Sequence, residues 1–117
     1  MKRDRVYLDH ILECIGWIER FTAEGREAFL KDRKTQSAVL RELQTLAEST
    51  ERLSEEFKSR HPQIPWRNIA GFRNILVHDY LGIKLDRVWE IIKGDLTLLR
   101  AALLAAMRIE IPLQPFP

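Results

Sequence analysis

The sequence has few of the residues that mark a secreted, membrane-bound or metal-binding protein. Its 117 residues include one cysteine, Cys14, so an intramolecular disulfide is impossible and a cysteine-rich metal site is excluded. No apolar run reaches the roughly 18 residues that a membrane-spanning helix needs. Residues 1–5 are charged and lead into an amphipathic segment, unlike the apolar stretch of a signal peptide. We therefore expect a cytoplasmic protein that makes no membrane contact and whose one cysteine is a buried thiol.

The chain also has little net charge. It carries 19 basic and 17 acidic residues, which gives +2 at pH 7. Affinity for a nucleic acid would therefore need a local basic patch rather than a basic protein. Hydrophobic residues make up 45% and charged residues 31%, the balance of a globular domain. A chain this short buries only about two-thirds of its unfolded surface, so a dimer interface is an expected source of additional stability.

The apolar residues recur at the three- and four-residue steps of amphipathic helices. No segment alternates with the two-residue period of a strand. Asp32 is the expected N-cap of the third helix, and Pro65 fits the first turn of the fourth. The expected helices span residues 4–21, 26–30, 32 or 33 to 59, 65 to 77 or 78, and 84 or 86 to 107.

The expected fold class is all-α. The chain is expected to form an antiparallel four-helix bundle with one short extra helix, and two such bundles are expected to form a dimer. Residues 1–108 are expected to form a single domain, and the proline-rich residues 109–117 a non-helical tail. The expected core consists of one apolar stripe from each long helix: Leu8, Ile11, Leu12, Ile15 and Ile18; Val39, Leu43, Leu46, Thr50, Leu53 and Phe57; Leu85, Val88, Ile92, Leu96, Leu99 and Leu103.

The pattern changes within the fourth helix, where polar side chains appear between core positions. Arg73, Asn74, His78 and Tyr80 can all form hydrogen bonds. At about 100° per residue, Asn74 and His78 share a face, whereas Arg73 and His78 lie about 140° apart. Two routes would bring an arginine to a histidine: the helix unwinds near His78, or a second copy supplies the complementary group across a dimer axis.

These residue types suit metal-independent RNA cleavage by internal attack of the ribose 2′-OH. Histidine can act as general base or acid near neutral pH, and arginine holds phosphate oxygens. Asparagine can position a phosphate or an imidazole, and tyrosine can stack on a base. No metal or other cofactor is indicated, because the carboxylates are scattered and no histidine pair has ligand spacing. A histidine near a helix end can equally serve as a cap or a core residue, so the pattern leaves that alternative open.

The run PWRNIAGFRNILVHDY, residues 65–80, resembles the signature block of HepT-type HEPN proteins. That family carries an arginine, four to six further residues and a histidine, usually followed by X-Tyr. Arg73, His78 and Tyr80 fill these places with a four-residue spacer, and Asn74 fills the polar position after the arginine.

The flanking segments are similar to the same family. Residues 66–71 precede the motif in the expected way, and residues 7–12 and 82–92 also resemble family segments, so the similarity spans nearly the whole chain. Lys84 departs from the family, because relatives often carry an acid after the Gly-Ile pair. That position lies in a connection and puts no catalytic residue in doubt.

The resemblance implies a homodimeric ribonuclease toxin of a type II or type VII toxin–antitoxin pair. Arg73 and His78 would be catalytic, and Asn74, Asp79 and Tyr80 would support them or bind RNA. The antitoxin would be an MntA-like nucleotidyltransferase that transfers AMP to Tyr80. That modification would place negative charge and bulk beside the catalytic pair and exclude RNA. Read from its position alone, Asp79 either orients a histidine or faces solvent at the helix end.

A second hypothesis is a non-catalytic subunit that binds a nucleotidyltransferase and serves as its substrate. In that case Tyr80 matters most and His78 is structural. A third reading is a helical bundle with no active site. Growth arrest on expressing the chain alone would favour only the ribonuclease.

Overall fold

In the computed structural model of the chain, the backbone is described for residues 2–78 and 84–110 and the side chains for residues 3–73 and 84–108. These residues form helices and turns without a strand, which confirms the all-α prediction for the described part of the chain. The helices are α1 (Lys2–Phe21), α2 (Arg26–Lys31), α3 (Arg33–Glu51), α4 (Glu55–Arg60), α5 (Trp66–His78), α6 (Leu85–Glu90) and α7 (Leu96–Glu110), with a π-helical turn Ile91–Asp95 between α6 and α7.

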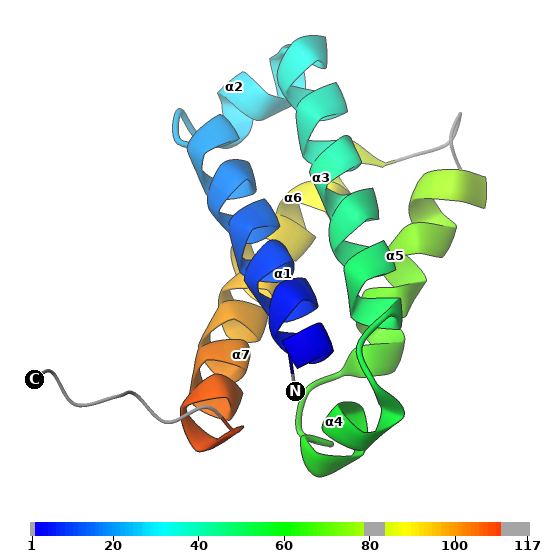
Figure 1. Cartoon of the computed structure of the whole chain (residues 1–117). Coiled ribbons are helices and arrows are strands. Elements are labelled where there is room, and N and C mark those ends of the chain that lie inside the picture. Colours follow the sequence, from blue (N-terminus) through cyan, green and yellow to red (C-terminus); the bar gives the residue numbers. More distant parts are fainter. Residues whose placement is uncertain (1, 79–83, 111–117) are drawn as a thin grey trace, which may run out of the picture.

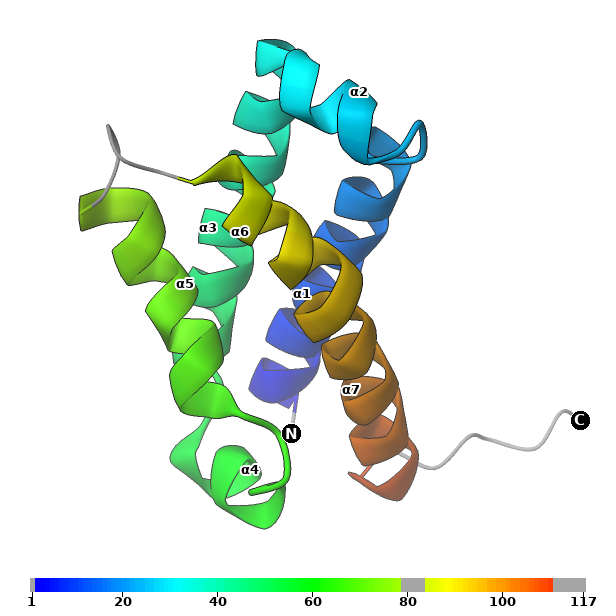
Figure 2. The same ribbon diagram turned by 180° about the vertical axis from the view of Figure 1, so that it is seen from behind.

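The long helices run alongside one another in alternating directions (Figure 1). α3 packs against α1 on one side and α5 on the other, and α7 returns along α1. Seen from behind, α5 lies at the left and the α6–α7 run at the right, both in front of α1 and α3 (Figure 2). No described helix combines the length and apolar character needed to cross a bilayer. The assignment to a dimerising four-helix bundle stays a prediction.

The core lies where the stripes of α1 and α3 meet. The predicted α1 positions are buried, except that Leu12 is only partly so. The α3 stripe is also buried, and burying one such aliphatic side chain contributes about 1.5–3 kcal/mol. Asp32 caps α3 as predicted, since its carboxylate accepts the Lys34 N–H at 3.0 Å. The fully buried stripe residues are Leu8, Ile11, Ile15, Ile18, Val39, Leu43 and Leu46.

The prediction of one helix from Asp32 or Arg33 to Ser59 is wrong, because α3 ends at Glu51 and a second helix follows. Ser54 begins the separate helix α4, and its hydroxyl accepts the Phe57 N–H at 3.0 Å. The apolar period continues across the break, with Leu53 and Phe57 both buried, so the hydrophobic pattern did not reveal it. The overlooked signal was a serine followed by two glutamates, a common N-terminal helix sequence.

A buried carboxylate ties this break to the start of α1. Asp4 is 6% exposed and accepts hydrogen bonds from the Ser54 N–H at 2.8 Å and the Ser54 hydroxyl at 2.7 Å. Hydrogen bonds to a charged group are stronger than those between neutral groups. The contact therefore fixes the first turn of α1 against the junction between α3 and α4.

Other helix boundaries differ from the predictions by a few residues. α5 begins at Trp66, so Pro65 lies just before the helix, where its carbonyl accepts the Ile69 N–H. The last helical run contains a π-helical turn, and α7 continues to Glu110. Residues 109 and 110 are therefore helical, contrary to the predicted tail. Residues 111–117 lie outside the described residues.

We predict that Asp4→Ala destabilises the chain by about 1–3 kcal/mol, because it removes two charge-assisted hydrogen bonds to Ser54. Asp9→Ala is the matched control in the same helix. Asp9 forms an exposed ion pair with Arg5, so its loss should cost less than about 0.5 kcal/mol. Urea titration of both variants measures the difference, and equal losses would contradict the role given to Asp4.

Candidate functional site

Arg73 lies on α5 with its guanidinium exposed to solvent. Its Nη1 donates to Glu51 Oε2 at the end of α3, at 3.2 Å. The two side chains are 48% and 42% exposed, so solvent screens the pair and its contribution to stability is about 0–1 kcal/mol. The ion pair therefore orients the guanidinium of Arg73, but the fold does not depend on it. The exposed guanidinium can be reached by an anionic ligand.

The other predicted site residues follow Arg73 along the chain. Asn74 and His78 are helical positions of α5, which spans Trp66–His78; the predicted helix extended to Val77 or His78. The side chains of Asn74 and His78, and all of Asp79 and Tyr80, lie outside the described residues. Because α5 stays helical to His78, positions 73 and 78 are separated by about 7.5 Å along the axis and about 140° around it. One subunit therefore does not direct both positions to the same side of α5.

A basic corner lies on the other side of Glu51. Arg3, Glu51, Arg52, Leu53 and Ser54 line an open depression of about 350 Å³. This corner was not predicted, because Arg3 and Arg52 come together only when the start of α1 meets the end of α3. The spacing of Arg3 and Tyr7, one helical turn apart, was the only local signal.

Tyr7 reports the positive potential of this corner. Hydrogen bonding from Arg52, followed by the charges of Arg52 and Arg3, lowers the pKa of the Tyr7 hydroxyl, against an opposing effect of desolvation. The two guanidinium groups stabilise negative charge on the Tyr7 oxygen relative to a tyrosine in water.

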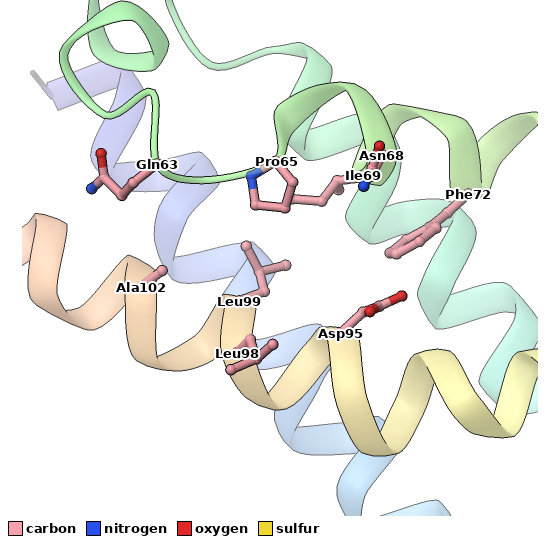
Figure 3. A pocket seen from close by; sticks show the side chains of 9 residues that line it. All are labelled: Gln63, Pro65, Asn68, Ile69, Phe72, Asp95, Leu98, Leu99 and Ala102. Carbon is pink, nitrogen blue, oxygen red and sulfur yellow. The ribbon is translucent and has the colours of Figure 1, made fainter.

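A larger pocket of about 440 Å³ lies between α5 and α7 (Figure 3). It shares α5 with Arg73, yet its walls are mainly apolar and none of its lining residues is basic. Such a surface suits the packing of apolar groups better than the binding of a phosphate. Its lining residues are Gln63, Pro65, Asn68, Ile69, Phe72, Asp95, Leu98, Leu99 and Ala102.

The two histidines with described side chains belong to the interior. His10 Nδ1 lies 2.6 Å from Ser49 Oγ, and its Nε2 lies 3.8 Å from Cys14 Sγ. Ser49 is 5% and Cys14 1% exposed, so a substrate could not reach this serine–histidine contact. His61 is buried against Phe57, with ring centroids 4.7 Å apart. Within the described residues, no group of three or more His, Cys, Asp or Glu side chains is placed to hold a metal ion.

Comparison with known proteins places this geometry in a family context. The family model described as "Ribonuclease HepT-like" matches residues 11–106, which include all of α5 and the segment 73–80. The Thermococcus cleftensis protein named "Probable ribonuclease HepT" is 42% identical over 102 residues, covering 86% of this chain and 93% of the relative. A Caldanaerobacter subterraneus subsp. tengcongensis protein named "Putative RNase TTE0752" is 41% identical over 97 residues, covering 82% and 87%. No solved structure matches the chain.

We predict that Cys14 does not react with thiol reagents in the folded protein. Burial raises the pKa of its thiol from 9.0 to about 12, so the reactive thiolate is scarce in mildly alkaline buffer. Unfolding returns the pKa to its ordinary value and exposes the sulfur. Colorimetric thiol titration with and without denaturant measures the change, and rapid labelling of the native chain would contradict the buried position.

Proposed function

The chain belongs to the HepT-like family of ribonucleases, and we propose that it is a metal-independent endoribonuclease whose catalytic pair is Arg73 and His78. The observation that carries the proposal is the family match across α5, combined with the exposed guanidinium of Arg73. An exposed arginine held by one weak ion pair can exchange its carboxylate partner for a phosphate. His78 follows five positions later in the same helix.

The proposed reaction is internal transesterification of an RNA strand. A neutral His78 takes the proton of a ribose 2′-OH, and the 2′-oxygen attacks the adjacent phosphorus. Arg73 stabilises the negative charge that accumulates on the phosphorane oxygens. The 5′-oxygen leaves as the bond to phosphorus breaks, and it receives a proton from a protonated histidine. The products are a 2′,3′-cyclic phosphate and a 5′-hydroxyl, so atoms and charge balance without a metal ion or a water.

The proposal includes a homodimer in which the site is completed across a two-fold axis. Positions 73 and 78 diverge around α5 within one chain, which favours pairing Arg73 of one subunit with the motif histidine of the other. An isologous interface would place two α5 helices face to face and supply two histidines, one as base and one as acid. We propose that each subunit is an antiparallel bundle of α1, α3, α5 and the α6–α7 run.

Three further residues are proposed to support the catalytic pair. Asn74 lies one turn before His78 and would position the phosphate or the imidazole. Asp79 would orient a histidine, and Tyr80 would stack on a base or bind a phosphate. These roles rest on chain position and on the family resemblance.

We also propose that the chain is the toxin of a toxin–antitoxin pair. Its antitoxin would be a nucleotidyltransferase that transfers AMP to Tyr80, releasing pyrophosphate from ATP. The added phosphate would compete with RNA for Arg73 by charge, and the adenosine would block the cleft by its bulk. This step explains how a cell can hold an active ribonuclease in check.

His78→Ala and Arg73→Gln should each lower cleavage of a labelled RNA at least about 100-fold, because each removes a group that acts only in the transition state. Arg73→Gln should leave unfolding free energy within about 1 kcal/mol of the parent, since its ion pair is exposed. Arg87→Gln is the matched control: it removes another exposed arginine with a glutamate partner and should cleave normally. Full activity in purified His78→Ala would overturn the catalytic assignment of His78, whereas no cleavage by the purified parent chain would favour a non-catalytic partner of the nucleotidyltransferase.

Co-expression with an MntA-like nucleotidyltransferase should add one or more AMP units to the intact mass of the chain. Tyr80→Phe should abolish the gain, because the acceptor hydroxyl is gone. Tyr7→Phe is the control and should keep the gain in mass, because Tyr7 and Tyr80 are the two tyrosines of the sequence. An unmodified parent chain would contradict adenylylation while leaving the cleavage reaction to its own test.

A further inference from the structure

The basic corner formed by Arg3, Tyr7 and Arg52 is not used by the proposed chemistry. It lies where the first turn of α1 meets the end of α3. Arg3 and Arg52 are exposed and Tyr7 is half-buried, and the two arginines together lower the pKa of the Tyr7 hydroxyl. Arg3 and Arg52 line the open depression, and guanidinium groups are common ligands of phosphate oxygens in proteins.

Hydrogen bonds between Asp4 and Ser54 fix the backbone that carries the two arginines of the corner. Asp4, next to Arg3 in sequence, accepts two hydrogen bonds from Ser54, which lies two residues after Arg52. Leu53 between them is 3% exposed. Both arginines therefore project from backbone that is anchored on either side of the depression. Such anchoring lowers the entropy lost when the corner binds a ligand.

The nearby carboxylates neutralise the corner only in part. Asp4 is buried and accepts two hydrogen bonds from the uncharged Ser54, so it keeps its own negative charge. Glu51 lines the depression and directs one oxygen to Arg73 at 3.2 Å. The three positive charges of Arg3, Arg52 and Arg73 therefore exceed the two negative charges of Asp4 and Glu51, and the overall charge of +2 does not reveal this local excess.

The corner is continuous with the candidate catalytic arginine. Glu51 touches Arg73, and Arg52 is the next residue along the chain. Arginine side chains therefore follow one another from α5 across the end of α3 to the start of α1, with Glu51 between Arg73 and the corner. An extended polyanion is the ligand that a line of separated cations fits best, because each phosphate can meet its own guanidinium.

We propose that Arg3, Tyr7 and Arg52 form a second phosphate subsite, which binds the backbone of a single-stranded RNA beside the phosphate held by Arg73. This inference rests on the proposed function in taking Arg73 as the residue that holds the scissile phosphate. The two arginines contact phosphate oxygens, and the Tyr7 hydroxyl keeps their guanidinium groups together. The subsite contributes affinity and strand position and takes no part in the proton transfers.

The test measures the salt dependence of RNA binding by the full chain. A fluorescent single-stranded RNA with 2′-O-methyl sugars serves as probe, because it lacks the attacking hydroxyl and stays intact. Fluorescence anisotropy gives the dissociation constant over a series of potassium chloride concentrations. Each phosphate contact on a single strand contributes about 0.7 to the slope of log K against log salt.

Arg3→Gln/Arg52→Gln should make that slope shallower by about 1.4, and Arg3→Gln alone by about 0.7. Arg3→Lys/Arg52→Lys should retain most of the slope, since it keeps the charges. Lys31→Gln/Lys34→Gln removes the same charge near the start of α3 and should leave the slope unchanged. Thermal unfolding shows whether each variant is folded. If the double variant is unfolded, the slope measured for Arg3→Gln alone tests the subsite.

A parental slope in both glutamine variants would overturn the subsite, as would an equal loss in the lysine-to-glutamine control. Competition by inorganic phosphate at constant ionic strength as strong as that by RNA would also overturn it, because a strand should gain from several contacts at once. Cleavage of ordinary RNA is assayed in parallel. Cleavage with an unchanged slope rejects the subsite alone, whereas a reduced slope without any cleavage supports the subsite and rejects the ribonuclease proposal.

Discussion

Burial of one face of α3 is the constraint on which the rest of the structure depends. Val39, Leu43 and Leu46 on that face are at most 1% exposed, and α1 and α5 both pack against this helix. Removing these side chains from water supplies the driving force for the arrangement. As a consequence, the end of α3 lies between the first turn of α1 and the face of α5 that bears Arg73. Every contact in the candidate site follows from that placement.

Two kinds of contact at this end of α3 have different roles. The Asp4–Ser54 hydrogen bonds are largely shielded from water and fix the backbone. The Arg73–Glu51 pair is exposed and easily exchanged. A fixed frame that carries exchangeable cations is a suitable design for holding a polyanion, because the ligand displaces weak partners and the fold is unaffected.

The sequence predicted much of the fold because amphipathic periodicity is a local property. The α1 and α3 stripes, the Asp32 cap and the end of α5 at His78 were all accessible to it. The break at Ser54 was not, because Leu53 and Phe57 keep the period through it. The turn was set instead by Asp4, fifty positions earlier in the chain. Long-range contacts of this kind leave no periodic trace.

The site shows the same division. The motif from Arg73 to Tyr80 could be recognised by its spacing and its resemblance to a family. The corner of Arg3, Tyr7 and Arg52 could not, because its members lie on two helices that only tertiary packing brings together. The net charge averages over the whole surface and conceals a local excess. The angle between positions 73 and 78 follows from helix geometry alone and is the reason for proposing a site shared between subunits.

The central claim is that the motif on α5 cleaves RNA by internal attack without a metal ion. Mass spectrometry of the product ends tests it most directly, using the purified chain, a defined RNA and a metal chelator in excess. The account predicts 2′,3′-cyclic phosphate and 5′-hydroxyl ends, and no cut where the ribose at the cleavage position is replaced by deoxyribose. Products with 3′-hydroxyl and 5′-phosphate ends, or cleavage that the chelator abolishes, would contradict it.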